Sequence, residues 1–257
     1  MRVLVIGGSG FVASLTLPLL KAKYDFRIYD RREPEFDPSL EFVRGDVGDF
    51  EAIRQASLGC DALLYMAMGR YIPIGTPYEE NIDALVSSME VNVKGVYLAL
   101  NAASTAGVRH AVYTSSMSIY SEDNLYERYF PDEELTPDAC DSYGFTKRMG
   151  ELVCQNACRE RGMSVNVLRL CFPRPDTDWA ERVEAGKPTL LTAGSDVARA
   201  LDSALQTQAG YQTFMVSGDY ENRILNMSKA KRMLGWEPLA RPKSADNWNE
   251  EITIPTD

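Results

Sequence analysis

The sequence predicts an α/β protein in which helices cover both faces of a doubly wound parallel sheet. Short apolar, β-branched runs of strand length alternate with longer segments of helical periodicity. A glycine-rich turn follows the first apolar run and opens the first helical segment. The chain has 257 residues, of which 45% are hydrophobic and 25% charged. These values are typical of a globular protein with one large domain and a small appendage.

The first predicted strand, residues 3–6, leads directly into the turn Gly7-Gly8-Ser9-Gly10-Phe11-Val12-Ala13. Glycines there let the backbone approach a diphosphate, whose charge meets the free N–H groups at the start of the following helix. A glycine cluster alone would often be a simple tight turn. With a strand before it and a helix after it, the pattern is typical of a Rossmann-type nucleotide-binding turn. The residues predicted to hold a cofactor here are Gly7, Ser9, Gly10, Phe11 and Val12.

The second predicted strand, residues 26–30, ends in Asp30, which follows Gly10 by 20 residues. A carboxylate at this distance suits the ribose hydroxyls of NAD and would repel the 2′-phosphate of NADP. Arg31 and Arg32 follow directly and could accommodate a phosphate, or could belong to a solvated turn. NAD is therefore the predicted cofactor, and NADP stays open as an alternative.

The next segments continue the alternation of strands and helices. Asp49 is predicted to cap a short helix that ends near Ser57. The apolar period predicts one long amphipathic helix, interrupted by Asn92, which is either an exposed polar residue or orders a lysine or a water beside the cofactor. The predicted ranges are a third strand at 41–44, a fourth at 61–68, the long helix at 79–106 and a fifth strand at 110–114.

Two sets of polar residues lie after the fifth strand. Ser115 and Ser116 stand at its carboxyl end, where open α/β sheets bind ligands, although a strand-end cap would explain them too. Tyr143 and Lys147 lie four residues apart, on one face of a helix predicted for 143–162. A free phenol titrates near pH ~10, so its use as a base at neutral pH needs a pKa lowered by roughly 3 units. An adjacent ammonium favours the phenolate, so the pair is a candidate device for proton transfer.

Five motifs in register resemble the extended short-chain dehydrogenase/reductases, the NAD-dependent epimerase/dehydratase family. They are the glycine turn of residues 7–13, Gly45-Asp46-Val47, Val91-Asn92-Val93-Lys94-Gly95, Ser115-Ser116-Met117-Ser118-Ile119-Tyr120 and Tyr143-Gly144-Phe145-Thr146-Lys147. The resemblance covers residues 1–175, which are expected to form the NAD(P)-binding domain with the catalytic residues. A small substrate-binding region is expected at 176–257, interleaved with the last strand and helices of the main domain.

The resemblance implies roles for individual residues. Tyr143 would be the acid/base, Lys147 its modulator and a ligand of the nicotinamide ribose, and Ser116 the partner of the substrate oxygen. The implied cofactor contacts further include Asp30, Arg31, Asp46, Val47, Ala67, Met68, Asn92, Phe172 and Pro173. The family often has His-Leu-Ala-Ala where this chain has Tyr65-Met66-Ala67-Met68, which leaves the shape of the pocket floor open.

The region after residue 173 is short, which favours a free sugar or sugar acid over a nucleotide sugar as the substrate. Compact uronate dehydrogenases share this length and layout. The candidate substrate residues are Tyr120, Arg70, Arg174 and Arg182, since arginines can hold a carboxylate bidentately, although each is also compatible with a surface position. Residues 121–142 form an acidic, proline-bearing stretch, which is either a lid or a solvated connector.

Composition argues against several other classes of function. A net charge of −10 and a pI near 4.8 disfavour nucleic acid and anionic membranes as partners. The five cysteines lack the spacing of a disulfide framework, and His110, the only histidine, has no partners for a zinc site. The glycines within the apolar start fit a strand and turn better than a secretion signal, and no apolar run is long enough to span a membrane. The cytoplasm is therefore the expected location.

Together these observations predict an NAD(P)-dependent oxidoreductase that removes hydride and a proton from a hydroxyl of a small sugar or sugar acid. Two alternatives stay open: an epimerase or dehydratase with tightly held NAD, and a protein that binds NAD(P) as a sensor without turnover. The helices at 79–106 and 143–162 could pair across a twofold axis, as in many family members, so a homodimer is expected.

Overall fold

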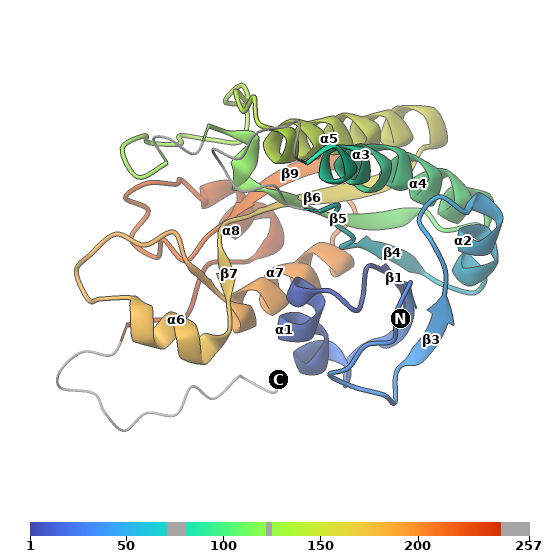
Figure 1. Ribbon diagram of the computed structural model, residues 1–257. Coiled ribbons are helices and arrows are strands. Elements are labelled where there is room, and N and C mark those ends of the chain that lie inside the picture. The colour runs from blue at the N-terminus through green and yellow to red at the C-terminus, as the bar shows by residue number, and fades with distance from the viewer. Residues whose placement is uncertain (71–80, 122–124, 243–257) are drawn as a thin grey trace.

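The computed structural model describes residues 1–70, 81–121 and 125–242, and its centre is a sheet of seven parallel strands (Figure 1). The order across the sheet is β3-β2-β1-β4-β5-β6-β9. These strands are β1 Arg2–Ile6, β2 Asp25–Asp30, β3 Glu41–Arg44, β4 Ala62–Tyr65, β5 His110–Ser116, β6 Ser164–Leu170 and β9 Tyr211–Val216. The order reverses between β1 and β4, where a doubly wound sheet places its ligand crevice. The predicted fold class is confirmed.

Helices cover the sheet on both faces, as the parallel connections require. On one face lie α1 Phe11–Leu20, α7 Gly194–Gln206 and α8 Ser228–Leu234. On the other lie α2 Phe50–Ser57, α4 Val96–Thr105 and α5 Ser142–Arg161 (Figure 1). Each face has its own buried apolar core, so the central strands are apolar on both sides. Asp49 caps α2 as predicted, with its side chain accepting a hydrogen bond from the Ala52 N–H.

The predicted helix at 79–106 is interrupted in its middle. Of this range, residues 79 and 80 lie outside the described part of the chain. The rest forms α3 Ile82–Met89, a π-helical turn η2 Glu90–Gly95, and α4. A π-turn holds one more residue than an α-turn, so it shifts the buried stripe and turns Asn92 completely inward. The interpretation of Asn92 as an exposed residue is therefore wrong.

The chain after β6 builds a small layer and then returns to the sheet. A two-stranded sheet of β7 Pro173–Arg174 and β8 Thr192–Ala193 encloses α6 Asp176–Arg182. Trp179 is fully buried there, and its indole N–H donates to the Leu191 carbonyl at 2.8 Å. The chain then re-enters the main domain as α7, β9 and α8, the elements predicted for its last part.

The acidic stretch between the serines and Tyr143 is anchored rather than simply solvated. Its residues 122–124 lie outside the described chain. Further along, Phe130 is fully buried and bridges to Leu225, and the Glu133 carboxylate accepts a hydrogen bond from the Met215 N–H of β9 at 3.1 Å. Burial raises the pKa of Glu133. The segment is thus fixed to the edge of the main sheet.

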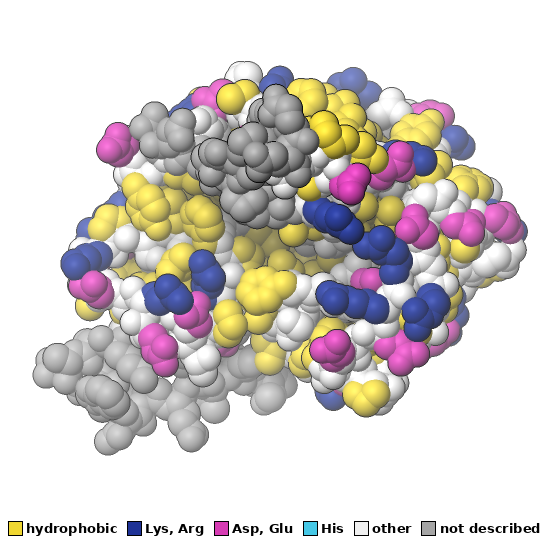
Figure 2. Space-filling model, in the orientation of Figure 1, with side chains coloured by type: hydrophobic (Ala, Val, Ile, Leu, Met, Phe, Trp, Pro, Cys, Tyr) yellow, Lys and Arg dark blue, Asp and Glu magenta, His cyan; other side chains and the backbone are white. Residues whose placement is uncertain are grey.

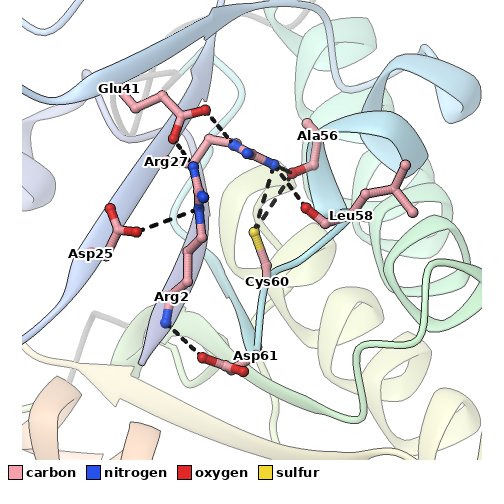
Figure 3. A network of polar contacts seen from close by, with 8 residues as sticks. All are labelled: Arg2, Asp25, Arg27, Glu41, Ala56, Leu58, Cys60 and Asp61. Atoms are coloured by element: carbon pink, nitrogen blue, oxygen red, sulfur yellow. Dashed lines mark hydrogen bonds and ion pairs between the residues drawn. The ribbon is translucent and has the colours of Figure 1, made fainter.

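A cluster of charged side chains lies at the amino-terminal ends of β1, β2 and β3 (Figure 3). The Arg27 guanidinium donates to the Glu41 carboxylate at 2.8 Å and to the Ala56 and Leu58 carbonyls at 2.6 and 3.1 Å. Arg2 pairs with the same carboxylate. Two arginines thereby tie β1, β2 and β3 to the carbonyl end of α2, where cations are favoured.

No helix in the described ranges is long and apolar enough to cross a membrane. Within the same ranges there is also no group of three or more histidine, cysteine, aspartate or glutamate residues that could hold a metal ion.

Candidate active site

A cavity of about 1230 Å³ opens at the carboxyl ends of the strands. Figure 2 shows this face hollowed, with arginine and lysine side chains gathered along one side of the hollow. Its walls come from the glycine turn, the ends of β2, β3, β4, β5 and β6, and one side of α3. Seventeen of the predicted site residues line it: Gly7, Ser9, Gly10, Phe11, Val12, Asp30, Arg31, Asp46, Val47, Ala67, Met68, Arg70, Ser116, Tyr143, Lys147, Phe172 and Pro173.

The glycine turn has the geometry of an anion cradle. Gly7 has a φ of +80°, and a side chain there would place its Cβ 2.3 Å from the Ala67 nitrogen. Gly10 is the N-cap of α1 and offers no side-chain cap, and the first turn of α1 contains no acidic residue. The first N–H groups of this ten-residue helix therefore have no acceptor within it and face the cavity. These residues fit the diphosphate of a dinucleotide.

Asp30 supports the turn as well as lining the cavity. Its carboxylate accepts hydrogen bonds from the Ser9 N–H at 3.1 Å and the Arg31 N–H at 2.7 Å. Further along the same wall, the Tyr29 hydroxyl donates to the Asp46 carbonyl at 2.9 Å. A Cβ on Gly45 would lie 2.2 Å from that hydroxyl, so only glycine fits there. These hydrogen bonds and the close contact at Gly45 hold this wall of the cavity in a fixed shape.

Tyr143 and Lys147 face the same cavity from the first turns of α5. Asp141 caps this helix by accepting from the N–H groups of Tyr143 and Gly144 at 3.0 and 2.9 Å. The Lys147 ammonium lies 6.0 Å from the centre of the Tyr143 ring and donates to the Thr114 carbonyl at 2.8 Å. Only 3% of Lys147 is exposed, and this burial lowers its pKa to about 8.

Ser116 is the last residue of β5. Its hydroxyl donates to the Ser118 hydroxyl at 3.0 Å and accepts from the Ser118 N–H at 3.1 Å. The start of α5 packs against this turn so closely that a Cβ on Gly144 would lie 1.9 Å from the Ser118 carbonyl oxygen. The fold thus brings Ser116, Tyr143 and Lys147 to one cavity from segments about 30 residues apart in the sequence.

Two predicted site residues support the cavity from behind its wall. Asn92 accepts from the Gly69 N–H at 3.1 Å and donates to the Thr146 hydroxyl at 3.0 Å, so it fixes the neighbours of the lining residues instead of lining the cavity itself. Tyr120 is fully buried, and its hydroxyl donates to the Leu135 carbonyl. The prediction of Tyr120 as a substrate contact is therefore wrong.

The three arginines predicted to contact the substrate have different positions. Arg70 lines the cavity, and its backbone is held by the side chains of Ser87 and Ser88 in α3. Arg174 and Arg182 do not line it; both pair with Asp178 of α6, at 3.8 and 2.6 Å. Asp178 lies four residues from each arginine and shares α6 with Arg182, so both arginines meet this carboxylate instead of lining the cavity.

Several lining residues were not among the predicted set. The first group, from α3 and the first residue of η2, consists of Asp83, Val86, Ser87 and Glu90. The second group, beside Ser116, consists of Met117, Ser118, Leu125, Leu170 and Cys171. The sequence did hold a signal for the second group. The carboxyl ends of neighbouring parallel strands lie side by side, so the residues that end the strand next to Ser116 were candidates too; Leu170 is its partner in the register. The sequence held no such signal for the first group, because its side chains belong to one face of a predicted long helix and nothing in the pattern distinguishes them.

A doubly wound sheet with an uncapped glycine turn, and with a Tyr-Lys pair of which the lysine is buried, defines a Rossmann-type, dinucleotide-binding protein. Residues 3–173 match the NAD dependent epimerase/dehydratase family, and the chain belongs to that family. The family is NAD-dependent, which confirms NAD as the cofactor and the resemblance seen in the five motifs.

Individual known proteins are similar to different extents. The chain is 28% identical over 203 residues to an undecaprenol-linked N-acetylglucosaminyl diphosphate 4-epimerase of Escherichia coli O157:H7, an alignment covering 76% of this chain and 57% of that protein. In general the chain spans about half the length of the first curated relatives that it matches.

Among solved structures, a short-chain dehydrogenase/reductase superfamily protein from Agrobacterium tumefaciens with bound NAD superposes with a TM-score of 0.75, covering 94% of this chain and 93% of that one. A mutated uronate dehydrogenase also gives 0.75, with coverages of 93% and 82%. Both are 19% identical to this chain, so they establish the fold that it shares with them.

Proposed function

We propose that the protein is an NAD-dependent oxidoreductase that acts on a hydroxyl group of a small sugar or sugar acid. The observation that carries the proposal is the meeting of Ser116, Tyr143 and Lys147 in the cavity that begins at the uncapped glycine turn. When bound, NAD supplies a hydride acceptor at its nicotinamide ring. The protein has to hold the substrate hydroxyl, remove its proton and keep the two reactants together.

In this proposal Tyr143 removes the hydroxyl proton and Ser116 donates a hydrogen bond to the same oxygen. The Lys147 ammonium, 6.0 Å from the Tyr143 ring centre, favours the phenolate that the proton transfer requires. The glycine turn with Phe11 and Val12 would bind the diphosphate, and Asp30 the ribose hydroxyls. Asp46 and Val47 would contact the adenine, and Ala67, Met68, Phe172 and Pro173 would form the walls around the nicotinamide half.

Arg70 is the candidate for contact with an anionic substrate. Of the three arginines considered, it is the one that lines the cavity, and the other two are paired with Asp178. Replacement of Arg70 by methionine would raise KM for a uronic acid much more than for the corresponding neutral sugar. Equal effects on the two substrates would assign Arg70 to the cofactor instead.

The test of the reaction is NADH formation, followed at 340 nm, over a panel of aldoses, uronic acids and UDP-sugars. A dehydrogenase accumulates NADH in proportion to the substrate consumed. An epimerase, the alternative favoured by the similarity to an E. coli 4-epimerase, converts its substrate without net NADH. Product analysis of the same reactions by NMR separates the two outcomes.

The third candidate function, binding of NAD(P) without turnover, is tested with Tyr143→Phe. This variant keeps the ring but loses the group that takes the proton. If the protein is an enzyme, turnover falls by at least a factor of about 10² while NAD binding, measured by titration calorimetry, is retained. Turnover equal to that of the wild type would remove Tyr143 from the mechanism.

A homodimer completes the proposal. Apolar side chains are exposed along one face of α3 (Ile82 and Met89) and one face of α5 (Phe145 and Leu152), and each of these four side chains is more than 40% exposed. The two helices are neighbours, so these side chains can form one surface that a second copy would cover. Sedimentation should give twice the chain mass of 28.7 kDa.

A further inference from the structure

A network of buried polar side chains lies directly behind the candidate catalytic residues. Its centre is the ion pair between Glu151 of α5 and Arg169 of β6, with both residues only 4% exposed. Arg169 donates from Nε to Oε1 at 3.0 Å and from Nη2 to Oε2 at 2.8 Å, a bidentate arrangement. The remaining Nη1 donates to the Tyr120 hydroxyl at 3.0 Å and to the Glu133 carbonyl at 2.8 Å. Every arm of the guanidinium therefore has a protein partner.

The network reaches the cavity through Ser115, whose hydroxyl donates to Glu151 Oε1 at 2.6 Å. Three consecutive residues at the end of β5 thereby have different partners. The Thr114 carbonyl accepts from Lys147, the Ser115 hydroxyl binds Glu151, and Ser116 faces the space beside Tyr143. Because Lys147 and Glu151 are one helical turn apart, these bonds fix α5 against β5 at two successive levels.

We propose that the Glu151–Arg169 pair, acting through Ser115, is a positioning device that holds Ser116 on β5 in register with Tyr143 and Lys147 on α5. The inference rests on the proposed function. A buried ion pair is weak evidence for stability, since an apolar pair of similar volume often stabilises a fold as well or better. The register between two elements that carry different parts of one reactive set gives this pair a role that an apolar pair could not fill.

The carboxylate also acts on the lysine through its charge. Lys147 faces the Tyr113 ring of β5, with its ammonium 5.1 Å from the ring centre, and Tyr143, Glu151 and Cys154 from its own helix. Burial lowers the pKa of Lys147 to about 8, and the negative charge of Glu151 opposes that fall. Removal of the Glu151 charge therefore moves the Lys147 pKa further down, an effect that can be measured without any substrate.

The experiment compares Glu151→Gln and Ser115→Ala with the control Glu160→Gln, which removes the same charge from an exposed position of α5. Competitive acetylation with acetic anhydride over a range of pH, followed by mass spectrometry of the peptide containing Lys147, gives the pKa of that amine. We expect it to fall by about half a pH unit or more in Glu151→Gln and to be unchanged in Ser115→Ala and in the control. An unchanged value in Glu151→Gln overturns the inference whether or not a substrate has been found.

Kinetics test the positioning itself on whichever panel substrate is turned over. Both Glu151→Gln and Ser115→Ala should lower kcat by about tenfold or more while KM for NAD changes less than about twofold, because misplacement affects the reacting groups and leaves the glycine turn intact. The double variant Glu151→Met with Arg169→Met replaces the ion pair by two apolar side chains and leaves no buried charge without a partner. Wild-type kcat in the double variant would mean that the ion pair has only a structural role and would overturn the proposal; a low kcat with an unchanged melting temperature supports it.

Discussion

The contact between Gly144 and the turn after β5 offers a direct test of how closely the two parts of the site are coupled. In Gly144→Ala, the new Cβ would lie 1.9 Å from the Ser118 carbonyl oxygen, whereas real Cβ atoms essentially never come within 3.0 Å of such an atom. The position of the Cβ is fixed by the helix backbone and the oxygen belongs to the backbone, so neither can rotate away. The start of α5 must therefore move by about 1 Å. Tyr143, the preceding residue, moves with it, while Ser116 stays with β5.

A displacement of about 1 Å between reacting groups costs on the order of 10²-fold in rate, or about 2.7 kcal/mol in the barrier. The effect on folding is smaller. Overpacking costs about 1–3 kcal/mol, and alanine recovers up to about 1 kcal/mol of helix propensity, which leaves a net loss of about 0–2 kcal/mol. At about 2–4 °C per kcal/mol, the melting temperature should fall by less than about 8 °C.

The assay is steady-state NADH formation on the substrate found with the panel, with melting followed by circular dichroism. Ser142→Ala, two residues earlier in the chain, serves as the control because it adds no atom. We expect kcat of Gly144→Ala to fall about 10²-fold with NAD binding retained. A variant that keeps more than half of the wild-type kcat would show that the distance between the serine turn and the tyrosine helix does not limit the reaction, and the reasoning would be wrong.

Other predictions follow from neighbouring features. If a charged Lys147 is needed, kcat should decline as pH rises through about 8, where this amine loses its proton, and a pH profile flat to 9.5 would contradict this. Because burial disfavours the charged amine, the folded state gains stability as pH rises from about 8 towards the unfolded pKa of 10.5, and Lys147→Met should raise the melting temperature at pH 7 while turnover is lost. Asp30→Ala should weaken NAD binding about tenfold and improve the ratio of NADP to NAD affinity, since Arg31 and Arg32 line the same wall; fluorescence titration with both reduced cofactors measures this. Phe145→Glu combined with Leu152→Glu should give a monomer in sedimentation experiments, whereas Glu160→Gln should leave the mass unchanged.

The sequence was most informative where one short segment carries both a structural and a chemical requirement. The glycine turn needs a positive φ at Gly7 and free N–H groups at the start of α1, and both are local properties of the chain. The pairing of Tyr143 with Lys147 is local in the same way, because one helical turn brings them together. Strand ends were predictable to within a few residues, since buried parallel strands are continuous apolar runs.

The remaining features depend on contacts between distant segments. Tyr120 has the residue type of a substrate contact, but it is captured by Arg169, which lies 49 residues away. Arg174 and Arg182 are different, because their partner Asp178 lies only four residues from each of them and the pairing is local. The π-turn at Asn92 also has no local signal, because it arises where a buried side chain must reach Gly69 and Thr146 together.

The arginine cluster at the amino-terminal edge of the sheet has a practical consequence. Arg27, Arg2 and Glu41 clamp the first three strands at the end farthest from the ligand cavity. The ion pairs that tie these strands together and the residues that line the cavity therefore lie at opposite ends of the same strands. Substitutions meant to change thermal stability, and sites for attachment to a solid support, therefore belong at this charged end, because none of Arg2, Arg27 and Glu41 lines the cavity.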